Sequence, residues 1–300
     1  MDVSSQYVGL KLKPFQAIIS PRDSMNYAAA IGDNNAVYFD DSQDKNIVAH
    51  PLQAIAATWP LLGSIWEYID ADNFPLQILS TQVHYSEHLQ LHRLINPGEK
   101  LDIKGEIAAI LPHRAGTHMI TRLDAFDENG QLVFSEYIGA LMRGVTCLDE
   151  GRGAENLPAK ISPPQKQVAP IWQSPIAIDP LMAFTYDAGA NIHFPIHTSK
   201  RFAQQVGLKE PILQGSATLA LAVTEMVNRE ANGDPARLLS IQCGFSATVI
   251  AGTQICVELL EKVENKEGIQ LLFQVLNSDG KVAIRNGRIS LKATNKNNGV

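Results

Sequence analysis

The feature that most constrains the fold of this 300-residue chain is an internal repeat. Two apolar runs joined by an Asn-Gly pair span residues 125–133, and their counterpart with an Asp-Gly pair spans residues 275–283. Such pairs between apolar runs are the strongest short-range signal of a β-hairpin. Residues 91–98 align without a gap on residues 245–252, and both segments end in a glycine. The chain is therefore expected to contain two copies of one unit.

A strand is expected directly after each of these glycines. Apolar residues occupy alternate positions there, at Leu101, Ile103, Ile107 and Ala109 in the first copy and at Ile255, Val257 and Leu259 in the second. This period of two places one face of a strand on a core and the other toward water or a partner.

A long apolar helix is expected ahead of the strands in each copy, from about residue 52 to 69 and from about 215 to 232. The second segment has little polar surface, which predicts a helix buried on nearly all sides. A helix lying on an ordinary α+β sheet would keep one polar face, and neither segment has one. We therefore expect an α+β fold in which each half wraps an antiparallel sheet around its buried helix.

A connector is expected between the two copies at residues 149–167, because this segment is rich in Gly, Pro and charged residues. It separates an N-terminal half, residues 1–148, from a C-terminal half, residues 168–300. Each half ends in unpaired sheet edges, so the two are expected to join side by side into one continuous sheet.

Composition and motif content exclude several classes of function. A formal net charge of −6 with no basic run disfavours nucleic acid as a partner. The most apolar stretch, residues 54–66, is too short to span a bilayer, and the polar N-terminus is unlike a signal peptide. Neither metal-ligand spacing nor a glycine-rich nucleotide loop is present, so no metal and no nucleotide cofactor are expected. Three cysteines without a CxxC pair predict a reducing compartment, and the expected location is the cytoplasm.

Several segments, taken in order, match one known pattern. In the second half, Pro-Ile-His-Thr at residues 195–198 precedes Pro-Ile-Leu-Gln-Gly at residues 211–215. In the first half, residues 83–98 resemble a strand entering a glycine turn, and residues 27–35 resemble a degenerate motif copy. This pattern resembles the MaoC-like double hot-dog family, particularly its hydratase-2 type, over nearly the whole chain. That type hydrates trans-2-enoyl-CoA to the (3R)-hydroxyacyl-CoA.

The decisive motif positions depart from the family pattern, which reads Asp-x-Asn-Pro-x-His. His197 matches the histidine and Pro195 the proline. Counting back five residues from His197 gives Ile192 in place of the aspartate. Aligning on Tyr186, with one inserted residue, puts Asn191 there instead. Both alignments lack the motif carboxyl group.

Two further positions differ from the pattern. Ser199 replaces the usual aspartate two residues after the histidine, and Gln214 replaces the usual histidine before the helix glycine. In the first half, Tyr38 stands at the place of the histidine although Asp33 is present. The resemblance implies that the first half is noncatalytic and accommodates the acyl tail.

Hydration of a conjugated thioester requires a base, a proton donor and a stabiliser of the enolate oxygen. His197 is expected to be the base because an imidazole titrates near neutrality. Gly215 opens the buried helix, where backbone N–H groups lack intrahelical partners and can stabilise an oxyanion. Asn191 can orient water but cannot act as an acid. Candidates for the missing carboxyl are Asp187 and Glu87, and Gln214 can add a neutral donor.

Structural interpretations compete with these roles. A lone histidine after Pro-Ile is often a cap or loop residue, and Glu87 with His84 and His88 can form a solvated strand face. His193, beside the apolar Phe194, is expected to be structural.

We expect reversible hydration and dehydration of a CoA thioester, with acyl-CoA as the partner and no separate cofactor. The alternatives are a noncatalytic acyl-CoA or lipid-binding protein and a hot-dog thioesterase. Neither nucleic acid nor a membrane is expected as a partner, and a homodimer is left open.

Overall fold

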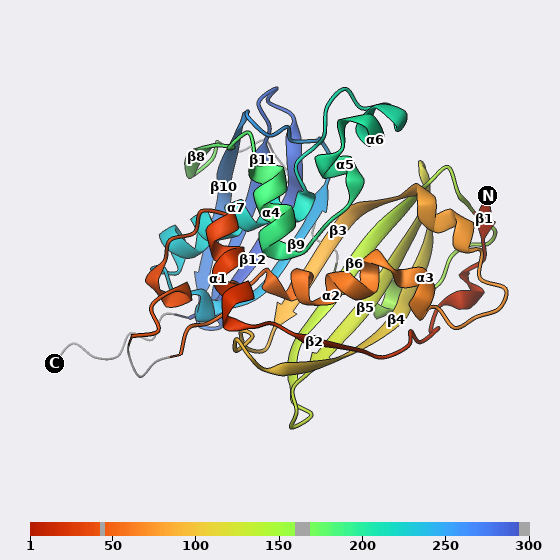
Figure 1. The fold of residues 1–300 in the computed structure, drawn as a ribbon, viewed down its shortest axis with the longest axis horizontal. Coiled ribbons are helices and arrows are strands. Elements are labelled where there is room, and N and C mark those ends of the chain that lie inside the picture. Colours follow the sequence, from red (N-terminus) through yellow and green to blue (C-terminus); the bar gives the residue numbers. More distant parts are fainter. Residues whose placement is uncertain (43–45, 160–168, 294–300) are drawn as a thin grey trace.

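A ten-stranded antiparallel sheet organises the molecule (Figure 1). The computed structural model describes residues 1–42, 46–159 and 169–293. Strand order across the sheet is β2-β4-β5-β6-β3-β9-β12-β11-β10-β8. The first-half strands are β2 (Phe15–Ile18), β3 (Gln82–Leu91), β4 (Lys100–His113), β5 (Gly116–Phe126) and β6 (Leu132–Arg143). The second-half strands are β8 (Trp172–Ala177), β9 (Leu238–Phe245), β10 (Gln254–Asn265), β11 (Gly268–Leu276) and β12 (Val282–Lys292).

The order of strands confirms the predicted repeat and the predicted continuous sheet. Read inward from each edge, the first half runs β2-β4-β5-β6-β3 and the second half runs β8-β10-β11-β12-β9. The halves meet where β3 pairs with β9, with Glu87 opposite Cys243. A separate parallel pair joins β1 (Asp2–Val3) to β7 (Thr146–Cys147).

Both predicted hairpins form, and their loops have the same geometry. In loops 127–131 and 277–281 the first residue donates its backbone N–H to the carbonyl of the fifth, over 2.9 Å in each case. Gly130 and Gly280 have φ angles of +74° and +71°, in the left-handed region that favours glycine. The two hairpins are β5–β6 and β11–β12.

The alternating apolar residues of the strands form the core as predicted. Leu101, Ile103 and Ile107 of β4 are fully buried, and Ile255, Val257 and Leu259 of β10 are buried in the same way. Alternation in β4 is interrupted by an irregularity between Ile107 and Ala109, which pairs them with adjacent residues of β5.

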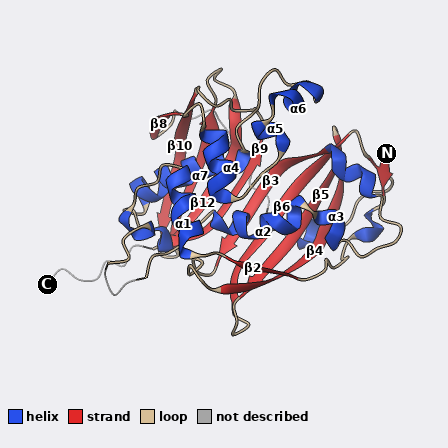
Figure 2. Ribbon diagram, viewed as in Figure 1, coloured by secondary structure: helices blue, strands red, loops and turns tan. Residues whose placement is uncertain are grey.

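One buried helix accompanies each half of the sheet, α2 (Gln53–Gly63) and α7 (Gly215–Glu230) (Figure 2). The first is shorter than expected: α2 ends at Gly63, and after Ser64 the short α3 (Ile65–Tyr68) follows. At the break Ser64 adopts a φ of −126° and a ψ of 31°, outside the helical range. In α7, burial on all sides extends only from Ser216 to Val223, because Thr224 and Glu225 are half-buried and the last turn exposes Asn228 and Arg229.

The remaining helices include α1 (Pro21–Ala30), α4 (Met182–Ala190), α5 (Pro195–Thr198) and α6 (Lys200–Gln205). Short 3-10 helices lie at Ser5–Tyr7, Ala36–Tyr38, Leu76–Thr81, Ala154–Asn156 and Pro235–Arg237. No helix within the described ranges is both long and apolar enough to cross a membrane.

Helices α1 and α4 pack together and hold the two halves at a second contact. Tyr27 and Tyr186, which occupy matching places in the two motif copies, meet with their hydroxyl oxygens 3.4 Å apart. Both side chains are fully buried, and their rings pack edge to face. The two halves are thus related by an approximate two-fold arrangement.

The connector is described only at its beginning. Asp149 accepts hydrogen bonds from Ser4 and Ser5, and Arg152 pairs with Ile110 of β4. Residues 160–167 lie outside the described residues, so the boundaries at 148 and 168 stay a prediction.

Gly189 lies within α4 and is needed where α4 crosses α1. A Cβ there would lie 2.6 Å from the Ala30 Cβ and 2.8 Å from the backbone oxygen of Asn26. We therefore expect Gly189→Val to lower the free energy of unfolding by about 1–3 kcal/mol through overpacking. Denaturant unfolding measures this loss, with Ala188→Val on the exposed side of α4 as the matched control. Equal midpoints for the two variants would contradict the close packing.

Candidate active site

His197 is held in one tautomer by the chain around it. Its Nδ1 lies 2.8 Å from the carbonyl oxygen of Ile212, and since a carbonyl only accepts, Nδ1 carries the proton. Nε2 is then the unprotonated nitrogen. Burial lowers the pKa of His197, while the Ile212 carbonyl and the charge of Asp187 act in the opposite direction. The imidazole is therefore neutral at physiological pH and has a basic nitrogen available.

The carbonyl that holds His197 belongs to the segment entering α7. Ile212 is followed by the buried Leu213, by Gln214 at the N-cap and by Gly215 at the first helical position. A helix N-terminus presents backbone N–H groups without intrahelical partners and carries a partial positive charge. His197, the candidate base, is thereby linked to the potential oxyanion site at Gly215 by its hydrogen bond to Ile212, three residues before Gly215.

Gln214 is structural in part. Its side-chain Nε2 donates to the carbonyl oxygen of Ala183 over 3.0 Å and so ties α7 to α4. The other amide atom, Oε1, is buried and has no hydrogen-bond partner within the described part of the chain.

The two motif alignments place different residues in different surroundings. Asn191 caps α4 in a left-handed conformation (φ 52°), is exposed and lines a pocket. Ile192 is only 3% exposed and packs in the hydrophobic core. The structure therefore brings Asn191, and not Ile192, to a surface that a ligand can reach.

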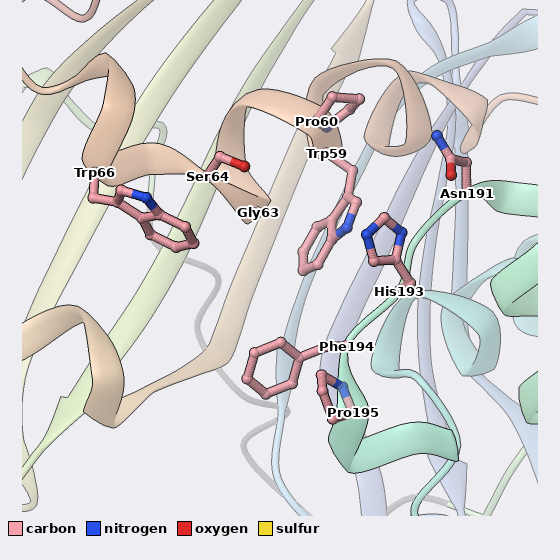
Figure 3. Close-up of a pocket in the computed structure, with 9 residues that line it drawn as sticks. All are labelled: Trp59, Pro60, Gly63, Ser64, Trp66, Asn191, His193, Phe194 and Pro195. Carbon is pink, nitrogen blue, oxygen red and sulfur yellow. The ribbon is translucent and has the colours of Figure 1, made fainter. Parts of the chain in front are cut away.

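An aromatic pocket of about 240 Å³ lies between the motif segment and the first-half helix (Figure 3). One wall comes from α2, Ser64 and α3, the other from the loop after α4 and the start of α5. Its lining comprises Trp59, Pro60, Gly63, Ser64, Trp66, Asn191, His193, Phe194 and Pro195. Neither His197 nor Gly215 is part of that lining. Sequence reasoning missed Trp59 and Trp66, although both interrupt an apolar helical segment with large aromatic rings.

His193, which is expected to be structural, lines the pocket. Its side chain is exposed, and its ring lies beside the indole of Trp59 in the pocket (Figure 3).

Three other candidates have local roles. Ser199 accepts a hydrogen bond from the backbone N–H of Phe202 over 3.2 Å and caps α6. The residue that replaces the family's aspartate therefore caps a helix. Tyr186 is buried against Tyr27, and Asp187 is half-buried on α4, where its charge acts on His197.

Glu87 does not lie on a solvated strand face. It is 1% exposed, and its Oε2 lies 3.0 Å from Nε2 of His84. A second buried carboxyl, Glu136 of β6, accepts a hydrogen bond from Thr58 of α2 over 2.6 Å. Sequence reasoning missed Glu136, although it stands at an inward position between Phe134 and Ile138 of an alternating strand.

The corresponding place in the first half is filled by a closed polar network. Asp33 is buried and accepts a hydrogen bond from Thr224 over 3.0 Å, with the Nε2 of His50 at 4.0 Å from its carboxyl. Tyr38, at the motif's histidine position, is fully buried. Nothing in the described ranges groups three or more His, Cys, Asp or Glu side chains as a metal site would.

Comparisons with known proteins agree with the fold described above and with the family that the motif positions resemble. Residues 164–279 match the sequence model of the MaoC like domain, and residues 6–136 match that of the FAS1-like, dehydratase domain region. A MaoC-like dehydratase from Phytophthora capsici superposes with a TM-score of 0.82 at 23% identity, covering 96% of this chain and 98% of that one. The fold is thus that of the MaoC-like double hot-dog proteins, as predicted.

Curated relatives point the same way at low sequence identity. The peroxisomal enoyl-CoA hydratase 2 of Arabidopsis thaliana is 21% identical over 296 residues, covering 94% of this chain and 93% of that protein. The peroxisomal multifunctional enzyme type 2 of Drosophila melanogaster is 24% identical over 220 residues, covering 72% of this chain. The chain spans only 35% of the fly enzyme's length. The predicted resemblance to the hydratase-2 type is confirmed.

Proposed function

We propose that this protein interconverts trans-2-enoyl-CoA and (3R)-hydroxyacyl-CoA thioesters by reversible addition of water. The observation that carries the proposal is the hydrogen bond from His197 to Ile212, which fixes a neutral imidazole beside the segment entering α7. The names of the Arabidopsis and Drosophila relatives support the reaction class.

Each of the candidate site residues has one role in the proposed reaction. Nε2 of His197 takes a proton from water as the water oxygen attacks C3 of the enoyl group. The negative charge of Asp187 stabilises the imidazolium that forms. Backbone N–H groups at Gly215 receive the developing thioester enolate oxygen. Asn191, on the pocket wall, orients the attacking water or the substrate.

The substrate is an acyl-CoA, and we propose no separate cofactor. The acyl group enters the aromatic pocket, which links the motif segment to the first half. We keep the cytoplasm and a homodimer as proposals, testable by cell fractionation and by solution mass.

Purified protein tests the reaction directly. With crotonyl-CoA and longer trans-2-enoyl-CoA substrates, hydration appears as loss of the absorbance of the conjugated thioester. Product chirality is read by chromatography against (3R) and (3S) standards. Release of free thiol instead would establish a thioesterase.

A noncatalytic acyl-CoA-binding protein is the second candidate. It is favoured by two observations: the motif carboxyl is absent, and the pocket lining does not include His197. Calorimetric binding of acyl-CoA without turnover of any enoyl-CoA would establish it.

Trp59→Ala tests the pocket as the acyl site. Because the indole forms part of the pocket wall, we expect its loss to raise KM for a long-chain enoyl-CoA by about tenfold, equivalent to about 1.4 kcal/mol of binding. Steady-state kinetics on crotonyl-CoA, whose short chain leaves the pocket unfilled, provide the matched control. An unchanged KM for the long substrate would place the acyl group elsewhere.

A further inference from the structure

We propose that the pair His84–Glu87 supplies the proton that hydration delivers to the substrate α-carbon. This inference rests on the proposed function and names the acid that the altered motif lacks. His84 is the group that would meet the substrate, and Glu87 is a positioning residue that acts through it.

The pair lies close to the N-terminus of α7. His84 and Glu87 belong to β3, the strand that joins the halves, and Nε2 of His84 lies 3.0 Å from Oε2 of Glu87. The His84 ring packs on Phe245, with ring centroids 4.4 Å apart. Phe245 in turn packs against Gly215, where a Cβ would lie 3.1 Å from its ring. A single aromatic ring thus separates the pair from the proposed oxyanion site.

Exposure differs sharply between the two side chains. The side chain of His84 is 23% exposed, whereas that of Glu87 is fully buried. In the proposed relay the substrate approaches the exposed part of the imidazole, and the carboxyl exchanges protons through it. Such a pair is suited to relay a proton.

Burial favours the protonated form of Glu87. Its Oε1 and the Oε1 of Glu136 have no hydrogen-bond partner among the described residues. Burial raises the pKa of both carboxyls, and the charge of Glu87 raises the pKa of Glu136 further. Hydrogen bonds from the His88 backbone to Glu87 and from Thr58 to Glu136 act in the opposite direction. Burial also lowers the pKa of His84 to about 4, against a backbone hydrogen bond with Ser86 that raises it. Both members of the pair are then neutral, with the carboxylic O–H donating to Nε2.

Titratable groups on three neighbouring strands surround Glu87. Glu136 on β6 is a second acid, and Cys243 on β9 has a raised pKa through burial first and the charge of Glu87 second. Arg285 on β12 acts on Cys243 in the opposite direction and stacks on Tyr85. None of the ion pairs found among the described residues joins a lysine or arginine to Glu87 or Glu136.

The water oxygen bonds to C3, its proton goes to Nε2 of His197, and the C2–C3 π electrons move into the thioester enolate. C2 takes a proton from the second ring nitrogen of His84 as Nε2 of His84 takes the proton of Glu87. Glu87 is left as a carboxylate and His197 as an imidazolium, and proton exchange with bulk water restores both.

Glu87→Gln is the direct test, because it keeps the shape and removes the acid. We expect kcat on an enoyl-CoA to fall by about 10²- to 10⁴-fold with KM changed only a few-fold. In the wild type, kcat should decline as pH rises through the raised pKa of Glu87, and this limb should vanish in the variant. Matched controls are Glu136→Gln, a second buried carboxyl, and His88→Gln on the same strand, both with kcat within a few-fold of wild type.

The results of these experiments distinguish a failure of the His84–Glu87 proton relay from a failure of the proposed hydration reaction. Wild-type kcat and an unchanged pH profile in Glu87→Gln would overturn the relay alone. A wild type inactive on every enoyl-CoA would overturn the proposed function, and the relay with it. Should Glu87→Gln fail to fold, His84→Gln replaces it, with the same loss expected and the same result overturning the relay.

Discussion

Replacing His197 with alanine is expected to lower kcat for hydration of an enoyl-CoA by about 10²- to 10⁴-fold, the range typical of a lost general base. The imidazole is neutral because burial lowers its pKa, and its Nδ1–H is engaged by Ile212, so Nε2 is the nitrogen that can accept the proton of water. Steady-state kinetics on crotonyl-CoA and on a longer substrate measure the loss.

Two comparisons make this result specific to the base. His193→Ala removes a neighbouring exposed imidazole and should leave kcat within a few-fold of wild type while changing KM, since His193 lines the pocket. Thermal unfolding of His197→Ala should remain cooperative, because the lost side chain is only partly buried. Wild-type turnover in His197→Ala would remove His197 from the mechanism.

Ile192→Asp is expected to lower the free energy of unfolding by about 3–5 kcal/mol, because it buries an uncompensated charge. The Ile192 side chain is 3% exposed and packs in the core, so water cannot solvate a carboxylate there. Denaturant unfolding measures the change. An Ile192→Asp variant as stable as wild type would show that this side chain reaches solvent.

Asn191→Asp is the matched substitution one residue earlier. Because Asn191 is exposed on the pocket wall and nearly isosteric with aspartate, stability should change by less than about 0.5 kcal/mol. The restored carboxyl should raise kcat by up to about tenfold, a modest gain if His84 and Glu87 already supply the proton. No gain in an active enzyme would remove Asn191 as the substituted acid.

Local patterns predicted much of this fold. The paired glycine turns at 127–131 and 277–281 formed matching hairpins, and the alternating residues of β4 and β10 faced the core. Turn geometry and a period of two depend on neighbouring residues alone, so one sequence is enough to show them. The interruption of the first helix at Ser64 was missed, because the apolar pattern continues through it.

Features of the candidate site that depend on contacts between distant segments could not be predicted from the sequence. In the sequence Glu136 looks like an ordinary charged strand residue, and Glu87 is only one of two candidate carboxyls. Both are buried because β3 pairs with β6 and with β9. The pocket needs α2 and the loop after α4 to meet, although more than a hundred residues separate them in the chain. Likewise, Asn191 and Ile192 are equal candidates in an alignment, and only packing exposes one and buries the other.

By itself, the sequence determined the two-fold repeat and the antiparallel α+β class, and the resemblance to the MaoC-like family singled out His197. The repeat and the fold class follow from periodicity and turn residues, which are local along the chain. The tertiary structure decided which titratable side chains are removed from solvent. Desolvation of His84, Glu87, Glu136 and His197 depends on the elements packed around them, and it is this burial that sets their protonation states and hence the chemistry proposed for them.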